Sequence, residues 1–567
     1  MSKTQRVETF ADLDNPESQI EELIKRNWWS SVPLTSFPAS WLSNGEQRLD
    51  GRFYANESFQ ALLVLQKSQL PIKNLASLVE ETFVCGRFKR VYATDKDAGW
   101  PYLSASEALM FRPESDRYLA KEHAPKGAES HFAKEGWILL SCSGTVGRSV
   151  IASKRLEKFF LTHDLIRIVP DEDIPVGYLY AYLSSWVGQA LISKDQYGSA
   201  IKHVEPHHID KIPVPLVDDS IQEKAHQNIM KAFQLRDEAN ELLDEADKLL
   251  HQSLGLPQFD EDLIDYFESP QQLDGEHIPA PKSFILNTSD LDDRFDGSYH
   301  VPVSRTAVKL VKQANYEAVS LGSIISDVFH PPRFPRTYVD EAYGVPFLQG
   351  SHLPHLRPYD LKYISKTVNE KQAKQCLLEP NWILVTRSGT IGRLGLVPKQ
   401  ATEWAASEHM IRIVAEKDVG HPGYIMAFLA TPYGQHQLKA KIYGAVVDEL
   451  TEADTEAVWM PKAPYEVQEK IGSKVVEAYE KKELANQIEA KAIRELERIL
   501  EGKGMEEETT QPTEQQDIEP QIEWAFEPTL GYEIEPTITK GEFENLLERL
   551  AKPQSKPSDP KKKGTSA

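Results

Sequence analysis

Cysteine is scarce in this chain of 567 residues, which holds three, Cys85, Cys142 and Cys376, far apart in the sequence. An odd number without CxxC spacing predicts neither a disulfide framework nor a zinc site. Long hydrophobic runs are also missing: the best apolar stretch, 178–192, is interrupted by serine, glycine and glutamine and is too short to cross a bilayer. The first ten residues, MSKTQRVETF, lack the apolar core of a secretion signal, so we expect a cytoplasmic protein.

The signatures of several enzyme classes are absent as well. The chain has no GxxxxGK[ST] phosphate loop, no GxGxxG dinucleotide fingerprint, no HExxH zinc motif and no GxSxG nucleophile elbow. A methyltransferase acting on DNA amino groups needs an Asn/Asp-Pro-Pro-aromatic loop to hold a flipped base. Here Asn15-Pro16 continues with Glu and Ser. We therefore predict no catalytic residue in this chain.

A stretch of about 200 residues, however, occurs twice, which fixes the architecture more firmly than local propensity does. Arg48-Leu-Asp-Gly returns as Arg294-Phe-Asp-Gly, 246 positions later, and the segment WILLSCSGTVGR at 137–148 returns as WILVTRSGTIGR at 382–393. Further matched pairs, in the same order, are 87–92 with 333–338, 166–169 with 411–414, Gly177-Tyr178 with Gly423-Tyr424, Gly188-Gln189 with Gly434-Gln435, and Tyr197-Gly198 with Tyr443-Gly444.

Each copy ends in a long helical pattern with apolar residues at three- and four-residue spacing over about four heptads. The apolar residues of the first helical pattern form a stripe of eight positions, and the residue 246 positions after each of them is also apolar. An amphipathic helix lying on its own domain is one interpretation; two matched rods in one chain favour packing against each other. The larger stripe residues, which we expect to form helices that bind partners, are Ile221, Ile229, Leu242, Leu250, Val467, Val475, Ile488 and Leu496.

The body before each helix mixes short apolar runs, typical of strands, with a helical segment at 177–192. We therefore predict a mixed α/β fold (α+β) with two tandem domains, each followed by a long helix. The predicted parts are an N-terminal helical extension (1–47), a first domain (48–216), a first helix (217–256), an acidic connector (257–293), a second domain (294–461), a second helix (462–502) and an acidic, largely disordered tail (503–567) with a short helix at 541–550.

Basic residues are outnumbered, with 64 Lys and Arg against 86 Asp and Glu and a net charge of −22, which by itself argues against a nucleic-acid partner. The distribution removes that objection. Counting charges by segment gives +1 for each repeated domain, −14 for 217–293, −3 for 1–47, 0 for 462–496 and −7 for 497–567. The acidity therefore lies on the first helix, the connector and the tails.

The ordered set of duplicated motifs resembles the specificity subunit of type I restriction-modification systems. The matching segments in the first copy are Ser143–Gly147, Gly177–Tyr180, Gly188-Gln189, Tyr197-Gly198, Ile212–Pro215 and Gln222; in the second they are Ser388–Gly392, Gly423-Tyr424, Gly434-Gln435, Tyr443-Gly444, Val458–Pro461 and Gln468. The resemblance covers residues 48–500. The second copy departs from it by lacking the first proline of the Ile-Pro-x-Pro segment.

The resemblance implies a non-catalytic ruler. Two target recognition domains, held apart by an antiparallel pair of helices, would each read one half of a split, asymmetric sequence in double-stranded DNA, and helix length would set the unread spacer. Two methyltransferase subunits, which bring S-adenosylmethionine, would dock on the helices. Restriction subunits with an ATP-driven motor and Mg²⁺ would join them, while this chain would carry no cofactor or metal.

Basic and aromatic positions in the repeats are the candidate DNA contacts, since arginine bonds guanine or phosphate. Residues shared by domains that read different half-sites cannot be base readers, so the shared ones are expected to position phosphates or the fold. The candidates at aligned positions are Arg87, Lys89, Arg90, Tyr92 and Arg148 in the first copy and Arg333, Arg336, Tyr338 and Arg393 in the second; all but Lys89, which corresponds to Pro335, have a counterpart of the same kind. Base readers are expected where the copies differ, as in Lys202-His203 against Asp448-Glu449, or 112–126 against 357–371.

Two further observations concern the histidines and tyrosines of the repeats. The histidines at 203, 207 and 208 correspond to Glu449, Ala453 and Asp454 in the second copy, so metal ligation there is not expected. Tyr197 and Tyr443 are equally compatible with buried core residues. The alternatives to DNA recognition are a standalone nuclease with an unrecognised active site, or a scaffold that binds proteins after losing the ability to read DNA.

Overall fold

The computed structural model describes residues 57–503 apart from 94, 195–201, 261–271, 274–275, 278–283, 292–293, 402 and 444–447. The predicted extension at 1–47, nearly all of the tail at 503–567 with its helix at 541–550, and Tyr197 lie outside these residues. No helix within the described part has the length and apolar character needed to cross a membrane.

The first repeat contains two small sheets. Its core sheet is antiparallel, in the order β2 (Val79–Phe83), β9 (Leu165–Pro170), β6 (Ile138–Ser141), β7 (Ser149–Ile151). The other has the order β3 (Tyr92–Ala93), β5 (Tyr118–Ala120), β4 (Gly99–Leu103), β8 (Phe160–Leu161), with β4 and β8 parallel. Strand β1 (Ile72–Asn74) pairs with β10 (Pro213–Pro215), and the helices are α4 (Glu57–Ser68), α5 (Ala105–Ala108), α6 (Val176–Ser184), α7 (Trp186–Lys194) and α8 (Pro206–Ile209).

The second repeat reproduces this topology strand for strand. Its sheets are β14 (Ile325–Phe329), β21 (Met410–Ala415), β18 (Ile383–Thr386), β19 (Leu394–Leu396), and β15 (Tyr338–Val339), β17 (Lys362–Ser365), β16 (Gly344–Leu348), β20 (Ala405–Ala406). Strand β13 (Ala318–Ser320) pairs with β22 (Trp459–Pro461), and the helices are α10 (Pro302–Lys312), α11 (Glu370–Cys376), α12 (Pro422–Ala430), α13 (Pro432–Ala440) and α14 (Glu452–Glu456). Between the repeats, β11 (Gln272–Leu273) pairs with β12 (Glu276–His277).

Even the irregularities of the two core sheets coincide. The register shifts between Val79 and Glu81 in the first repeat and between Ile325 and Asp327 in the second, 246 positions later. In the central pair, Leu139 faces Arg167 just as Leu384 faces Arg412. Because a slip of one residue would turn every side chain to the opposite face, this agreement confirms the tandem mixed α/β duplication predicted from the sequence.

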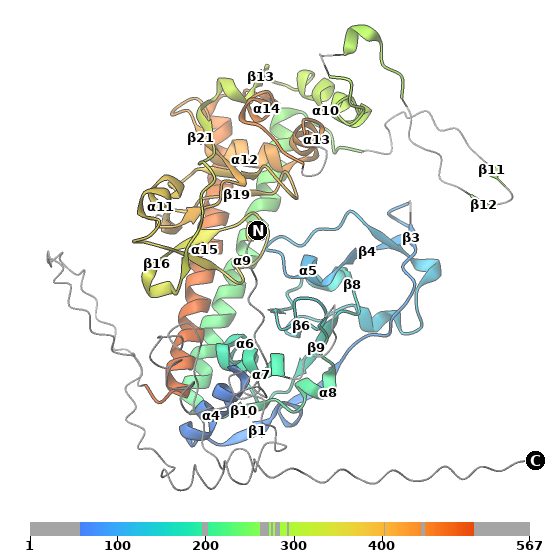
Figure 1. Cartoon of the computed structure of the whole chain (residues 1–567). Helices are drawn as coiled ribbons and strands as arrows, with labels where there is room; N and C mark the ends of the chain where they lie inside the picture. The colour runs from blue at the N-terminus through green and yellow to red at the C-terminus, as the bar shows by residue number, and fades with distance from the viewer. Residues whose placement is uncertain are drawn as a thin grey trace, which may run out of the picture. The chain divides into compact units, whose positions relative to one another are not determined.

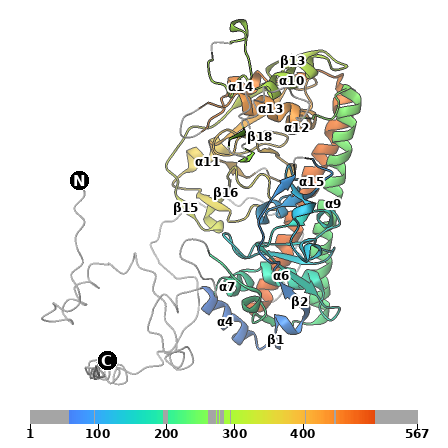
Figure 2. The same cartoon turned by 90° about the vertical axis from the view of Figure 1, so that its right-hand side faces the viewer.

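The helices α9 (Asp219–Leu254) and α15 (Tyr465–Leu500) each have 36 residues and are therefore about 54 Å long. They run side by side along both repeats (Figures 1 and 2). Lys224 pairs with Glu495 at 3.2 Å and Glu245 with Lys474 at 2.6 Å, so residue numbers rise on one helix as they fall on the other. The predicted antiparallel pairing is confirmed.

The apolar stripe of each helix is buried inside this chain. Four of its predicted members are at most 2% exposed: Ile229, Leu250, Val475 and Leu496. Ile221 packs on the core of the first repeat, Val467 on that of the second, and Leu242 and Ile488 lie between the helices. Both interpretations of the stripe therefore hold at once, because each helix lies on the repeats and on the other helix. A partner subunit docking on the helices must contact other residues.

A buried ionic cluster joins both helices to both repeats. Glu489 of α15, 1% exposed, accepts hydrogen bonds from Arg236 of α9 and, at 2.9 Å, from the Tyr180 hydroxyl of α6. Arg357, from the loop after β16, lies 3.1 Å from the same carboxylate. Burial disfavours the ionised acid, but the two guanidinium groups outweigh it and lower the pKa of Glu489.

The symmetry-related joint has lost this chemistry. At an offset of 246, Glu489 corresponds to Leu243, Arg236 to Lys482, and Arg357 to Phe111. Lys482 Nζ lies 4.6 Å from the centre of the Phe111 ring and donates a hydrogen bond to the Leu353 carbonyl at 3.2 Å. Burial lowers the pKa of Lys482 to about 8. The duplicated fold therefore has one ionic joint and one apolar joint.

The two repeats also touch each other directly. Met110 and His355 form an antiparallel bridge, the Phe111 amide donates to the Pro354 carbonyl at 2.8 Å, and the Leu356 amide donates to the Leu109 carbonyl at 3.2 Å. Since Leu109 and Leu356 are the counterparts of His355 and Met110 at the offset of 246, the contact is self-complementary, as a pseudo-twofold axis requires.

Candidate nucleic-acid interface

In each repeat the structure gathers segments that are distant in sequence around the Ser-Gly-Thr turn. In the first repeat, which carries this turn between β6 and β7, the Gly144 amide donates to the Lys202 carbonyl at 3.0 Å, and Ser143 bridges to His203. The loop before β9 joins this group, because the Cys142 amide donates to the Asp164 carbonyl at 3.1 Å. The duplicated basic segment 87–92 reaches the same loop through Arg90.

Arg90 connects that segment to the loop by polar contacts. Its Nη2 lies 3.6 Å from Asp164 Oδ2 and 3.4 Å from Thr162 Oγ1. Arg87 and Lys89 on the same segment are exposed, and Tyr92 is 42% exposed. Burial lowers the pKa of His163 in this loop, and the charges of Arg90 and Arg87 lower it further, against the opposing effect of Asp164. The imidazole is therefore neutral at pH 7 and adds no positive charge to the group.

The second repeat builds the same arrangement with more ion pairs. Arg336 bonds Glu408 of the equivalent loop, with Nη2 2.5 Å from Oε1, and Arg333 bonds Glu449 at 3.0 Å. The Ser388 hydroxyl of the turn lies 2.6 Å from His409 Nδ1. An open cleft of about 490 Å³ lies beside these contacts and is lined by Arg333, Phe334, Pro335, Arg336, Tyr338, Glu408 and His409.

The shape of the turn explains one pair of duplicated motifs. Gly147 and Gly392 have φ of 95° and 84°, a region that favours glycine. A Cβ at either position would lie 2.7 or 2.9 Å from the Oε1 atom of the glutamine in the Gly-Gln motif. Those glutamines, Gln189 and Gln435, in turn donate to the carbonyls of Gly147 and Gly392 at 2.9 and 3.0 Å. Ser-Gly-Thr and Gly-Gln are therefore two halves of one structural clamp.

The remaining duplicated motifs contact one another in the same way. The Tyr178 and Tyr424 hydroxyls donate at 2.5 Å to the carbonyls of Pro215 and Pro461, at the ends of the Ile-Pro-Val-Pro segment and its counterpart. Gln222 and Gln468, at the start of the long helices, each donate at 2.8 Å to the carbonyl five residues earlier. These shared residues hold the fold together, which agrees with the expectation that shared positions do not read bases.

Two buried arginines, which were not among the residues predicted from the sequence, support the loops that carry Asp164 and Glu408. Arg167 and Arg412 are 0% exposed, and their guanidinium groups donate to carbonyls of the preceding loop, including those of Thr162 (3.1 Å) and Ser407 (2.9 Å). Burial lowers the pKa of both, that of Arg412 to about 10. The available signal was a duplicated arginine inside a strand of otherwise apolar residues.

Two other predicted contacts lie elsewhere. Arg148 bonds Asp360 of the other repeat at 2.7 Å and lies 4.8 Å from the centre of the Tyr359 ring, at the contact between the repeats. Arg393 is half-buried, and burial lowers its pKa. The structure thus brings together 87–92 with Lys202 and His203, and 333–338 with the 448–449 segment, while Arg148 and Arg393 lie outside these groups.

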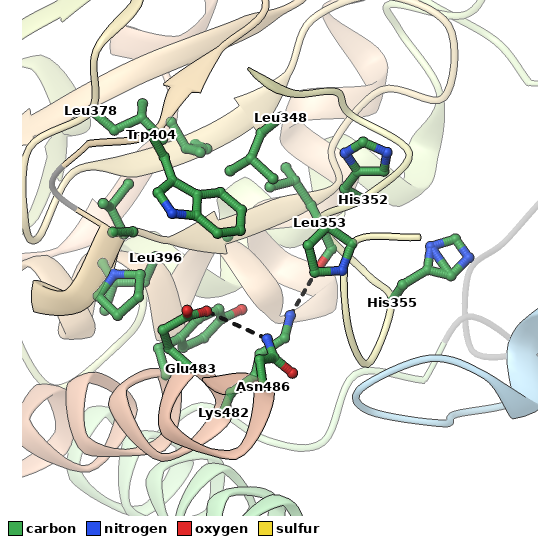
Figure 3. Close-up of a pocket in the computed structure, with 17 residues that line it drawn as sticks. Leu348, His352, Leu353, His355, Leu378, Leu396, Trp404, Lys482, Glu483 and Asn486 are labelled. Atoms are coloured by element: carbon green, nitrogen blue, oxygen red, sulfur yellow. Dashed lines mark hydrogen bonds between the residues drawn. The ribbon is translucent and has the colours of Figure 1, made fainter. Parts of the chain in front are cut away.

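A small cavity lies between the second repeat and α15 (Figure 3). It has a volume of about 70 Å³ and is lined mainly by apolar side chains such as Leu353, Leu396 and Trp404, with Lys482 and Asn486 pointing toward it from the helix. A water molecule needs about 10–15 Å³ of such space, so the cavity has room for several water molecules. Within the described residues, no group of three or more His, Cys, Asp and Glu side chains is placed to hold a metal ion.

Residues 107–245, from the first repeat into α9, match the family model of the type I restriction modification DNA specificity domain. Over these residues the chain is similar to the specificity subunits of type I restriction-modification systems. The resemblance seen in the duplicated motifs is thereby confirmed. The matched stretch is a DNA specificity domain of the kind found in these systems.

Solved structures of specificity subunits are also similar to this chain. The type I S subunit from M. genitalium is 11% identical over 76% of this chain and 95% of its own, with a TM-score of 0.32. The HsdS subunit from Thermoanaerobacter tengcongensis is 13% identical over 76% and 96%, with a TM-score of 0.24. The assignment does not depend on these weak superpositions. A search of curated proteins gives no match.

Proposed function

We propose that this specificity subunit directs a type I methyltransferase and restriction complex to a split, asymmetric sequence in double-stranded DNA, each repeat reading one half-site. The observation that carries the proposal is a pair of equivalent, oppositely charged residues. Lys202 and Asp448 are related by the offset of 246, both are exposed, and each precedes the residue that bridges to the serine of the turn. The same scaffold therefore presents different chemistry at the same place.

The chemistry of these side chains differs in what it recognises in the major groove. Lysine donates to the O6 and N7 acceptors of guanine, whereas aspartate accepts from the N4 amino group of cytosine. Around them, Arg87 with Lys89, and Arg333, supply phosphate contacts, which position the protein on DNA without carrying sequence information. Two copies that share phosphate contacts and differ in base contacts would read an asymmetric target.

The partners follow from the same assignment. We propose two methyltransferase subunits that bring S-adenosylmethionine, with restriction subunits that use ATP and Mg²⁺, in a cytoplasmic complex. They would contact the charged, exposed faces of α9 and α15, because the apolar stripes are covered by the repeats. Target affinity would depend on this assembly, since each nearly neutral repeat attracts phosphate only weakly.

Sequencing of methylated adenines in cells with and without the gene tests the proposal. We expect methylation at a split motif that disappears with the gene. Lys202→Asp should alter the motif in one half and Asp448→Lys in the other half, while Lys154→Asp, at a side chain 80% exposed in the first repeat, should leave both halves unchanged. Methylation that is independent of the gene would refute the function, and substitutions that alter both halves or neither would refute the assignment of one repeat to each half-site.

A further inference from the structure

A groove at the far end of the second repeat carries an unusual concentration of positive charge. It has a volume of about 610 Å³ and is lined by α10, the end of α13 and β22. Helices α10 and α13 lie side by side in Figures 1 and 2, and both contact β22. Among the residues that the structure describes, its lining includes Arg305, Lys309, Lys312 and Lys441 and no aspartate or glutamate. In a chain with a net charge of −22, such a surface is an exception.

Three of these cations project from one helix. Arg305, Lys309 and Lys312 stand at positions i, i+4 and i+7 of α10 and are exposed, so they share one face and repel one another. At 1.5 Å per residue they span about 10 Å. That distance covers about three phosphates of one DNA strand, which follow one another at about 3.4 Å along the duplex axis.

Aromatic and backbone contacts hold the groove in shape. Lys312 Nζ lies 4.3 Å from the centre of the Trp459 ring, and Lys441 Nζ lies 5.7 Å from that of Tyr299. The Gln437 side chain fixes β22 by accepting from the Trp459 amide at 2.8 Å and donating to its carbonyl at 2.9 Å. The indole thus orients one lysine ammonium in the open groove.

The fold does not require cations at these four positions, because the first repeat has none of the four. Helix α4 is the counterpart of α10, as the buried pairs Ala61 with Ala307 and Leu65 with Val311 show. The four positions that correspond to the basic residues are Phe59 for Arg305, Leu63 for Lys309, Gln66 for Lys312 and Asp195 for Lys441, and Trp459 corresponds to Pro213. The first repeat instead has Lys67 and Lys194 at the counterparts of Gln313 and Ala440. Cations present in one copy serve a role that the duplicated scaffold does not.

We propose that this groove binds the phosphate backbone of duplex DNA next to the second half-site, extending the contact on that side of the target alone. The inference rests on the proposed function and adds a surface outside the clusters around the two turns. Contacts by lysine to phosphate are independent of sequence, so the groove would contribute affinity without contributing specificity.

The test uses the full chain assembled with its methyltransferase partner, a 40-base-pair duplex with the target and one of random sequence, between 50 and 200 mM salt. Each lysine–phosphate contact adds about 0.9 to the slope of log affinity against log salt. Lys309→Gln with Lys312→Gln should therefore reduce the slope by about 2 and weaken both duplexes equally. The charge-matched control, Lys154→Gln with Lys417→Gln, removes two exposed lysines from the repeats outside the groove and outside the long helices and should leave the slope unchanged.

Hydroxyl-radical footprinting of the wild-type complex should show protected backbone beyond the second half-site and not beyond the first, and the groove variant should lose the extra protection. An unchanged slope and footprint in the groove variant would overturn the inference while leaving the proposed function intact. Loss of the methyltransferase partner with normal DNA binding would also overturn it, by showing that the groove binds protein. A wild-type complex that binds no DNA would instead refute the proposed function itself.

Discussion

Glu489 supplies the negative charge at the ionic joint, and removing that charge should destabilise the molecule far more than removing any surface carboxylate. Its side chain is 1% exposed and faces Arg236, 3% exposed, and Arg357. In Glu489→Gln the shape is kept, but two guanidinium groups stay enclosed without a counter-charge. Breaking a buried ion pair by removing one partner typically costs about 3–5 kcal/mol, and we expect a loss in this range.

Urea unfolding followed by circular dichroism measures this loss. Glu245→Gln is the matched control, because Glu245 also pairs across the two helices, with Lys474, but is 59% exposed; it should cost at most about 1 kcal/mol. Replacing Glu489, Arg236 and Arg357 together by leucine, leucine and methionine should recover most of the loss, since apolar packing replaces a buried ion cluster at little net cost.

The pH dependence gives an independent signature. Because the folded-state pKa of Glu489 lies below its ordinary value, its contribution is fully present above about pH 4.5 and is lost as pH falls through the lowered folded pKa. The wild type should therefore lose stability over this acidic interval faster than Glu489→Gln does. A glutamine variant within 1 kcal/mol of the wild type at pH 7, or an identical acid profile, would refute the account of the joint.

Three further outcomes are expected. At the apolar joint the pKa of Lys482 is lowered to about 8, so the wild type should gain stability as pH rises from about 8 to 10.5. Lys482→Met should be more stable than the wild type at pH 7 and should lack this gain when urea unfolding is measured across the pH range. Equal pH profiles of the two proteins would contradict this account of Lys482. Gly147→Ala should lower stability by about 1–2 kcal/mol, because a Cβ there would lie 2.7 Å from Gln189 Oε1 at positive φ, while Gly86→Ala, with no neighbour within 4 Å, should change the melting temperature little. Arg167→Met should lower the free energy of unfolding by about 3 kcal/mol or more, because buried carbonyls lose their donors. A loss below about 1 kcal/mol in thermal unfolding, as expected at an exposed site, would show that the loop keeps its structure without Arg167.

The sequence by itself determined the plan of the molecule: a duplicated mixed α/β body, two long helices with apolar stripes, and a family with recognisable motif order. These features are periodic or repeated, so they can be read without coordinates. Gln189 and Tyr178, which occur in both copies, hold the scaffold together in the structure, and residues common to both copies cannot distinguish two half-sites.

Only the tertiary structure decided which residues from distant segments of the chain are in contact. Arg148, Asp360, Arg236 and Glu489 come from four separate segments, and their pairing depends on how two repeats close around an antiparallel helix pair, which no local pattern encodes. The charge of the groove on α10 is visible only when α13 and β22 are placed beside it. The burial of Ile229 and Leu496 likewise shows that these side chains pack inside this chain. An apolar stripe in a sequence predicts that one face of a helix is covered, but it does not identify what covers that face.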